Sequence, residues 1–230
     1  MEFTDIAMEL SKEAWQASFH HPFVLQLQEE NLEPSIFRYY LIQDAYYLKS
    51  FSEAYHLLAD KTSNEEMKRL LKQNAQSLVE GELFIRQQFF KELGISDQEM
   101  EQHPIAPTCY HYISHIYRQF AEPNLGIAFA SLLPCPWLYH DLGKALNRKP
   151  SPNPLYQRWI ETYITDELEQ QIKEEEALVN QLYRESDETD KQKMLEAFHR
   201  SVHMEAKFWE MAYQHQTWTS DLQSLETEKK

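Results

Sequence analysis

Glycine and cysteine are both scarce in this chain of 230 residues, which contains four glycines and two cysteines. Because glycine marks turns, its scarcity and the long stretches without turn signals predict helices throughout the chain. Two cysteines, Cys109 and Cys135, are too few for a disulfide framework, and their separation excludes a CxxC metal pair. A chain of this length can bury a sizeable core without such cross-links.

Positive charge is also in short supply. Lys and Arg total 22 against 37 Asp and Glu, which gives a formal net charge of −15 at pH 7. This balance argues against nucleic acid or an anionic membrane as a partner. No apolar run approaches the roughly 18 residues of a membrane span, and Met1–Trp15 contains too many acidic residues for a signal peptide. We therefore expect a soluble, cytoplasmic protein.

Aromatic residues, in contrast, are abundant, with 12 Phe, 13 Tyr and 5 Trp. This number exceeds what a leucine-rich bundle needs, so we expect some of the rings to line a cavity. Apolar residues recur at helical spacing, and neither a strand signal nor an internal repeat is present. The prediction is an all-α, single-domain helical bundle over residues 1–220, followed by a polar, flexible tail at 221–230.

Capping residues, prolines and Gly94 mark the ends of the expected helices. Thr4, Asn64 and Ser96 are the predicted caps of three of them. The predicted helices cover residues 4–19, 23–29, 35–58, 65–93, a short segment after Ser96, 108–121, 124–133, 136–146, 155–164, 166–185 and 189–216.

The segment Leu132–Asp141 places Cys135 between two prolines. Proline is favoured at the first position of a helix, so we expect Pro136 to begin a helix with Cys135 at or beside its N-cap. The positive end of the helix dipole would favour the thiolate, a suitable nucleophile for an electron-poor ring. The alternative, which this segment supports equally, is a cysteine buried as a small apolar side chain.

Two acidic residues occupy positions where helical spacing predicts an apolar side chain. Asp44 lies in an aromatic stripe one turn before Tyr47, and Glu205 lies between Val202 and Trp209. A buried carboxyl is costly unless it is paired, which favours a role in a site for both residues. Burial would raise the pKa of Glu205, so that this group could hold a proton at neutral pH and deliver it. The alternative is that each merely accepts a buried hydrogen bond, Asp44 from a neighbouring helix and Glu205 from a Tyr or His.

Two E-x-x-H motifs, Glu53–His56 and Glu196–His199, suggest a different chemistry. Two such motifs with a Glu from each of two other helices form a di-iron carboxylate site, as in helical-bundle oxidases. Glu80, Glu82 and Glu161 are available to complete it. Both motifs flank the apolar stripe of their helix, however, so a Glu–His pair on the helix surface is the favoured interpretation.

Three segments of the chain together resemble the TenA/thiaminase II family. They are Asp44-Ala45-Tyr46-Tyr47, the run LPCPWLY at 133–139 and the run HMEAKFWEMA at 203–212. The cysteine segment is the most specific and is typical of the cysteine-bearing branch, and the likeness covers essentially the whole length. The resemblance implies a heme-oxygenase-like all-α fold without heme, usually a homotetramer, with no metal or organic cofactor.

The same resemblance implies an aminopyrimidine aminohydrolase, or thiaminase II, active in thiamine salvage. Such an enzyme hydrolyses 4-amino-5-aminomethyl-2-methylpyrimidine to hydroxymethylpyrimidine and ammonia. It also splits thiamine into hydroxymethylpyrimidine and hydroxyethylthiazole. A regulator that binds a pyrimidine without turning it over is a further alternative, although the intact Cys, Glu and Asp set argues against it.

Residue roles follow from the resemblance. Cys135 is implied to be the nucleophile that adds to the pyrimidine ring, and Glu205 the acid that protonates a ring nitrogen. Asp44 would hold the exocyclic amine, while Tyr47 would hydrogen-bond the sulfur and raise its reactivity. The other implied contacts with the substrate come from tyrosines: Tyr112, Tyr139 and Tyr163.

Overall fold

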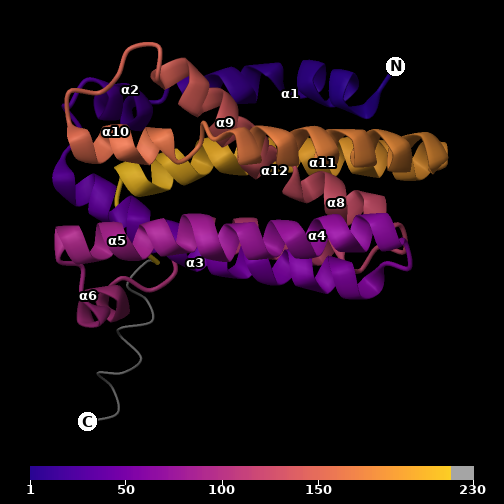
Figure 1. The fold of residues 1–230 in the computed structure, drawn as a ribbon, viewed down its shortest axis with the longest axis horizontal. Coiled ribbons are helices and arrows are strands. Elements are labelled where there is room, and N and C mark those ends of the chain that lie inside the picture. Colours follow the sequence, from indigo (N-terminus) through magenta and orange to yellow (C-terminus); the bar gives the residue numbers. More distant parts are fainter. Residues whose placement is uncertain (219–230) are drawn as a thin grey trace, which may run out of the picture.

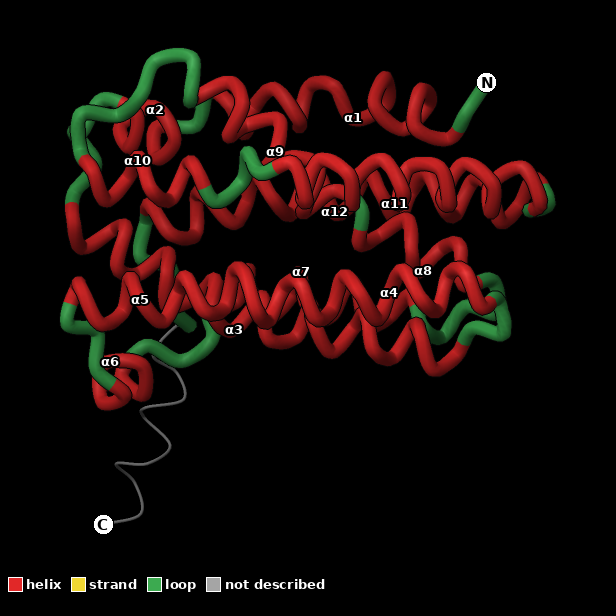
Figure 2. The backbone as a smooth tube through the Cα atoms, viewed as in Figure 1, coloured by secondary structure: helices red, strands yellow, loops and turns green. Residues whose placement is uncertain are grey.

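The chain folds into a bundle of helices joined by short loops (Figure 1). The computed structural model describes residues 1–218, except for the side chains of residues 82–84. No β-strand occurs among residues 1–218 (Figure 2), which confirms the all-α prediction. The predicted tail at 221–230 lies outside the described residues.

The helices follow one another in two runs on either side of a proline-containing loop. The first run consists of α1 (Phe3–Phe19), α2 (Pro22–Gln28), α3 (Pro34–Lys61), α4 (Glu65–Leu78), the π-helical segment η1 (Val79–Leu83), α5 (Phe84–Leu93) and α6 (Asp97–Gln102). The second consists of α7 (Pro107–Gln119), α8 (Leu125–Leu132), α9 (Pro134–Leu146), α10 (Pro154–Glu161), α11 (Asp166–Glu185) and α12 (Glu188–Tyr213).

Most helix ends lie close to their predicted positions because the capping residues act as expected. The side chain of Asn64 accepts a hydrogen bond from the N–H of Met67 at 3.0 Å and caps α4. Gly94 follows the last residue of α5 with φ +64°, a left-handed conformation that glycine adopts without strain. The cap predicted at Thr4 is wrong, because α1 begins at Phe3.

The single helix predicted over 65–93 is interrupted by η1. A π-helical segment places an extra residue in the turn, so the residues after it fall on a different face from the one that an unbroken 3.6-residue period predicts. The sequence of η1 contains Gly81 but no proline to signal the break. This change of register determines which side of α5 points into the protein.

The last long helix, α12, is the centre of the bundle. It packs against α1, α7 and α8, and also against α3 and α9, while α3 and α4 run side by side along one edge of the molecule (Figure 1). Trp209 on α12 is fully buried and lies 5.6 Å from the ring of Tyr40 and 6.3 Å from that of Trp159, centroid to centroid. Burying a side chain as large as Phe stabilises a fold by about 1.5–3 kcal/mol, so this aromatic core fixes the helices that carry the site. None of the described helices is long and apolar enough to cross a lipid bilayer.

Candidate active site

Cys135 lies where α8 and α9 meet, joined through Leu133 alone. The predicted helix start at Pro136 is wrong: α9 begins at Pro134, so Cys135 is its second residue rather than lying at or beside the N-cap, which is Leu133. The N–H groups of the first turn have no partner within a helix, so neither proline removes a helical hydrogen bond. Cys135 is 9% exposed and lies in the first turn of α9, at its positive end.

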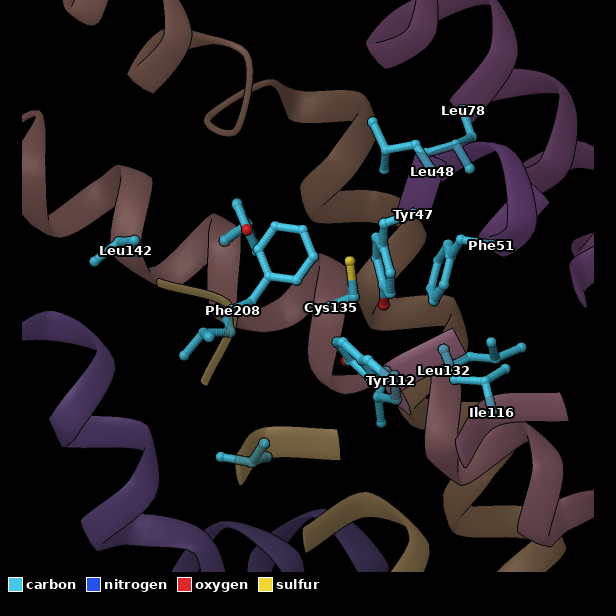
Figure 3. Close-up of a cluster of buried hydrophobic side chains, with 14 of the residues drawn as sticks. Tyr47, Leu48, Phe51, Leu78, Tyr112, Ile116, Leu132, Cys135, Leu142 and Phe208 are labelled. Carbon is cyan, nitrogen blue, oxygen red and sulfur yellow. The ribbon is translucent and has the colours of Figure 1, made fainter. Parts of the chain in front are cut away.

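Aromatic rings from three other helices surround the sulfur of Cys135. Figure 3 shows this sulfur between the rings of Tyr47 and Phe208, with Tyr112 beside them. The ring of Tyr47 lies 4.8 Å from that of Tyr112 and 5.7 Å from that of Phe208. Burial, and then the neighbouring Cys135, raise the pKa of Tyr47 well above its ordinary value, so its hydroxyl keeps its proton. The sequence reasoning did not select Phe208, although it follows Glu205 by three residues and therefore shares its helix face.

Glu205 is 1% exposed and is held by Tyr112. The hydroxyl of Tyr112, on α7, donates a hydrogen bond to Oε1 of Glu205, on α12, at 2.6 Å. Burial and the charge of Glu205 both raise the pKa of Tyr112, so this tyrosine remains a donor. A tyrosine as hydrogen-bond partner is what the alternative interpretation of Glu205 expects. The Glu205–Tyr112 pair also lies next to the ring of Tyr47, which in turn neighbours Cys135.

Asp44, 3% exposed on α3, forms a buried ion pair with Arg86 of α5, which is 2% exposed. Nε of Arg86 donates to Asp44, and Nη2 donates to the hydroxyl of Tyr163. Burial raises the pKa of Asp44, and the Arg86 guanidinium counteracts part of this rise. Arg86 was not among the predicted site residues. It precedes Phe89 by three residues and Phe90 by four, and this helical spacing was the available sign that it faces inward.

Two adjoining hollows meet at Cys135. The smaller, of about 10 Å³, is lined mainly by residues predicted for the site, and the larger has a volume of about 750 Å³. Cys135, Pro136 and Leu168 line both hollows, so the sulfur lies at their junction. The predicted residues that line the smaller hollow are Asp44, Tyr47, Cys135, Tyr139 and Tyr163. The other two predicted residues, Tyr112 and Glu205, do not line the smaller hollow. The ring of Tyr47 lies between them and this hollow.

The E-x-x-H motifs do not meet at this site. Glu53 on α3 and Glu196 on α12 have exposed carboxylates, so both motifs place their acid on the helix surface rather than in the core. Glu80 and Glu161 are also exposed, and the side chain of Glu82 lies outside the described residues. Among the side chains that are described, no group of three His, Cys, Asp or Glu is placed to hold a metal ion.

The chain is similar to known proteins along most of its sequence. The sequence model of the TENA/THI-4/PQQC family matches residues 10–215, nearly the whole chain. The chain belongs to the TENA/THI-4/PQQC family. The family resemblance in the sequence is thereby confirmed.

Relatives within the TENA/THI-4/PQQC family match the chain over most of its length. An aminopyrimidine aminohydrolase of Bacillus subtilis is 34% identical, over 95% of this chain and 93% of its own. One from Halalkalibacterium halodurans is 28% identical, over 95% of this chain and 98% of its own. The solved structure of a TenA homologue from P. horikoshii OT3 superposes with a TM-score of 0.84 at 23% identity, covering 93% of this chain and 99% of the homologue.

This TENA/THI-4/PQQC chain also contains a third buried acid, Glu175 on α11, which the sequence reasoning passed over. Glu175 is 1% exposed, and its Oε1 accepts hydrogen bonds from Tyr55 at 2.8 Å, Asn74 at 2.6 Å and Gln171 at 3.3 Å. Oε2 is buried without a hydrogen-bond partner in the described part of the chain. Burial raises the pKa of Glu175 to about 7, more than its hydrogen bonds lower it. Its spacing of three from Ile172 and Leu178 was the available sign of its burial.

We expect the free energy of unfolding of the natural protein to fall as pH rises, and that of the Glu175→Gln variant not to share this fall. The folded state holds the Glu175 proton up to about pH 7, whereas the ordinary value is 4.5, so the folded state binds more protons between these values. The contribution of Glu175 to the free energy of unfolding therefore falls as pH rises from about 4.5 to about 7, by up to about 3 kcal/mol. Above about pH 7 this contribution no longer changes. The check is urea unfolding of both proteins at pH 5 and pH 8. Parallel pH dependences would show that Glu175 titrates normally.

Proposed function

We propose that this chain is an aminopyrimidine aminohydrolase, a hydrolase of C–N bonds, with Cys135 as its nucleophile. The observation that carries the proposal is the placement of the Cys135 sulfur and the Asp44 carboxylate at one aromatic-walled hollow, with the Glu205–Tyr112 pair adjoining it. A flat heterocycle with an amino group fits this combination of rings, acid and sulfur. The names of the family relatives support the same activity.

In the proposed reaction Cys135 and Glu205 each act twice, first on addition to the ring and again when the product is released. The Cys135 thiolate adds to an electron-poor carbon of the pyrimidine while Glu205 gives its proton to a ring nitrogen. The C–N bond at the methylene then breaks, and the amine leaves with the bonding electron pair and a proton. Water then adds to the methylene carbon and releases a proton, which replaces the one that left with the amine. When the C–S bond breaks, its electron pair returns to sulfur and restores the Cys135 thiolate, and the ring nitrogen gives its proton back to Glu205.

Binding of the ring requires side chains to move. The smaller hollow has a volume of about 10 Å³, close to the roughly 10–15 Å³ that one water molecule needs. Nε of Arg86 donates a hydrogen bond to the Asp44 carboxylate, which lines this hollow. We infer that the amino group of the pyrimidine replaces the Arg86 guanidinium as the partner of Asp44. Tyr139 and Tyr163, whose rings lie 4.8 Å apart, then form one wall of the enlarged pocket.

The proposal predicts that the purified protein releases ammonia from 4-amino-5-aminomethyl-2-methylpyrimidine. Ammonia and hydroxymethylpyrimidine should form in equal amounts, because one C–N bond is hydrolysed per turnover. Ammonia is measured enzymatically and hydroxymethylpyrimidine by chromatography on the same samples. Tight binding of the pyrimidine with no ammonia formed would contradict hydrolysis and indicate a pyrimidine-binding regulator.

A further inference from the structure

One motif that the proposed function leaves unused contributes a histidine to a pair on the surface of α12. His199 ends the motif Glu196-x-x-His199, and His203 follows it by four residues, so the two rings share one face of the helix. His199 is half-buried and His203 is exposed. His203 precedes Glu205 by two residues, which places it on the opposite side of α12 from that acid. The pair is therefore separate from the hollows at Cys135.

The two imidazoles bring the same ring nitrogen together. Nε2 of His203 lies 3.1 Å from Nε2 of His199, and the ring centroids are 4.5 Å apart. Imidazole nitrogens bind Zn²⁺ at about 2.0–2.1 Å, so two of them on one ion are roughly 2.8–3.4 Å apart at octahedral to tetrahedral angles. The observed separation falls within this range. A single ion can therefore take both nitrogens as ligands without a change in the backbone of α12.

Ser11 on α1 orients the half-buried ring. Its Oγ lies 3.1 Å from Nδ1 of His199, and Ser11 is 1% exposed. When Nδ1 carries the proton and donates it to this oxygen, Nε2 keeps a free electron pair for an ion. Metal-ligating histidines almost always have such a partner on their other nitrogen. Burial, and then the charges of His203 and Arg200, lower the pKa of His199, so this ring is neutral at pH 7, as a ligand must be.

The charges around the pair permit a cation. Arg200 is the cationic neighbour of His199, and its Nη2 donates to Oε2 of Glu196 at 2.9 Å, which offsets its charge. The whole chain has a formal net charge of −15, which attracts cations. Among the described side chains, no third His, Cys, Asp or Glu is grouped with the pair, so water completes the ligand set.

We propose that His199 and His203 form a surface site for one divalent transition-metal ion. Imidazole ligands suit Ni²⁺, Cu²⁺ and Zn²⁺, whereas Mg²⁺ and Ca²⁺ prefer oxygen. Two histidines four residues apart on one helix face are a spacing that proteins use to bind zinc. The ion links two successive turns of α12 and takes no part in the hydrolysis. The inference is independent of the proposed function, because a protein that turned over no pyrimidine could still bind the ion.

The test is calorimetric titration of the metal-free protein with Ni²⁺ at neutral pH. We expect the natural protein to bind one ion per chain, and His203→Ala to bind it at least about tenfold more weakly because one ligand is lost. Ser11→Ala keeps both ligands and removes only the partner of Nδ1, and it should also weaken binding by about tenfold. His203 is exposed, so its replacement should leave the protein folded, which circular dichroism checks.

His56→Ala is the matched control, because His56 is an exposed histidine on α3 with no histidine one turn before or after it. It should bind Ni²⁺ as the natural protein does. A titration with Mg²⁺ separates coordination from general attraction by the acidic surface, and it should show no binding at this site. The inference is overturned if the natural protein does not bind Ni²⁺ at one ion per chain, if His203→Ala binds it with unchanged affinity, or if Mg²⁺ binds equally well.

Discussion

Cys135→Ser should lose at least about 100-fold in kcat while remaining folded, as expected for a covalent nucleophile. A serine hydroxyl has nearly the same size as the thiol, and its side chain needs no new space at the junction of the two hollows. It ionises far less readily than a thiol, so the attacking anion is lost at neutral pH. Ammonia release measures kcat, and circular dichroism with thermal unfolding shows whether the variant is folded.

Cys109→Ser is the matched control for this substitution. Cys109 is fully buried, and its Sγ donates a hydrogen bond to the backbone carbonyl of Gln43 at 3.5 Å, which a serine hydroxyl can also do. It lines neither hollow beside Cys135. We expect near-normal turnover from this control. Near-normal turnover from Cys135→Ser would rule out the covalent mechanism and leave Cys135 as a packing residue.

Glu205→Gln should bind the pyrimidine but turn it over at least about 100-fold more slowly, the usual size of a general acid's contribution. A glutamine oxygen can still accept the hydrogen bond from Tyr112, so packing at this fully enclosed position is retained. The amide, however, has no proton to deliver to the ring nitrogen. Calorimetric titration with hydroxymethylpyrimidine measures binding, and ammonia release measures kcat.

Tyr112→Phe separates the acid from its hydrogen bond. This variant removes the hydroxyl that contacts Glu205 and leaves the carboxyl in place, so its loss of kcat should be smaller than that of Glu205→Gln. If Glu205→Gln shows an unchanged kcat, Glu205 has no acid role. The buried hydrogen bond with Tyr112 would then be its whole contribution.

The candidate site residues that could be selected from sequence pattern alone are those whose chemistry conflicts with their position in a helix. Asp44 and Glu205 stand out because a carboxyl interrupts an apolar stripe, and Cys135 stands out between its two prolines. Tyr139 and Tyr163 could be selected only through the family resemblance, because the chain has 13 tyrosines and most occupy similar apolar stripes. Helical spacing tells which face of a helix is buried, but not which buried hydroxyl reaches a cavity.

The features that the sequence did not reveal depend on exact helix register. Two adjacent candidate starts, Pro134 and Pro136, both suit the first turn, so composition could not decide where α9 begins. The π-helical segment η1 shifts the inward face of α5 without a proline to announce it. Arg86 therefore could not be connected with Asp44 until both helices were placed.

The ion pair between Asp44 and Arg86 has a thermodynamic consequence for any ligand of this site. If the ligand needs the Asp44 carboxylate, only the fraction of molecules in which Arg86 has swung away is competent to bind. The apparent dissociation constant then equals the intrinsic one divided by that fraction. If Asp44 binds the ligand as proposed, Arg86 therefore acts as a competitor that belongs to the same chain and is present at a constant effective concentration.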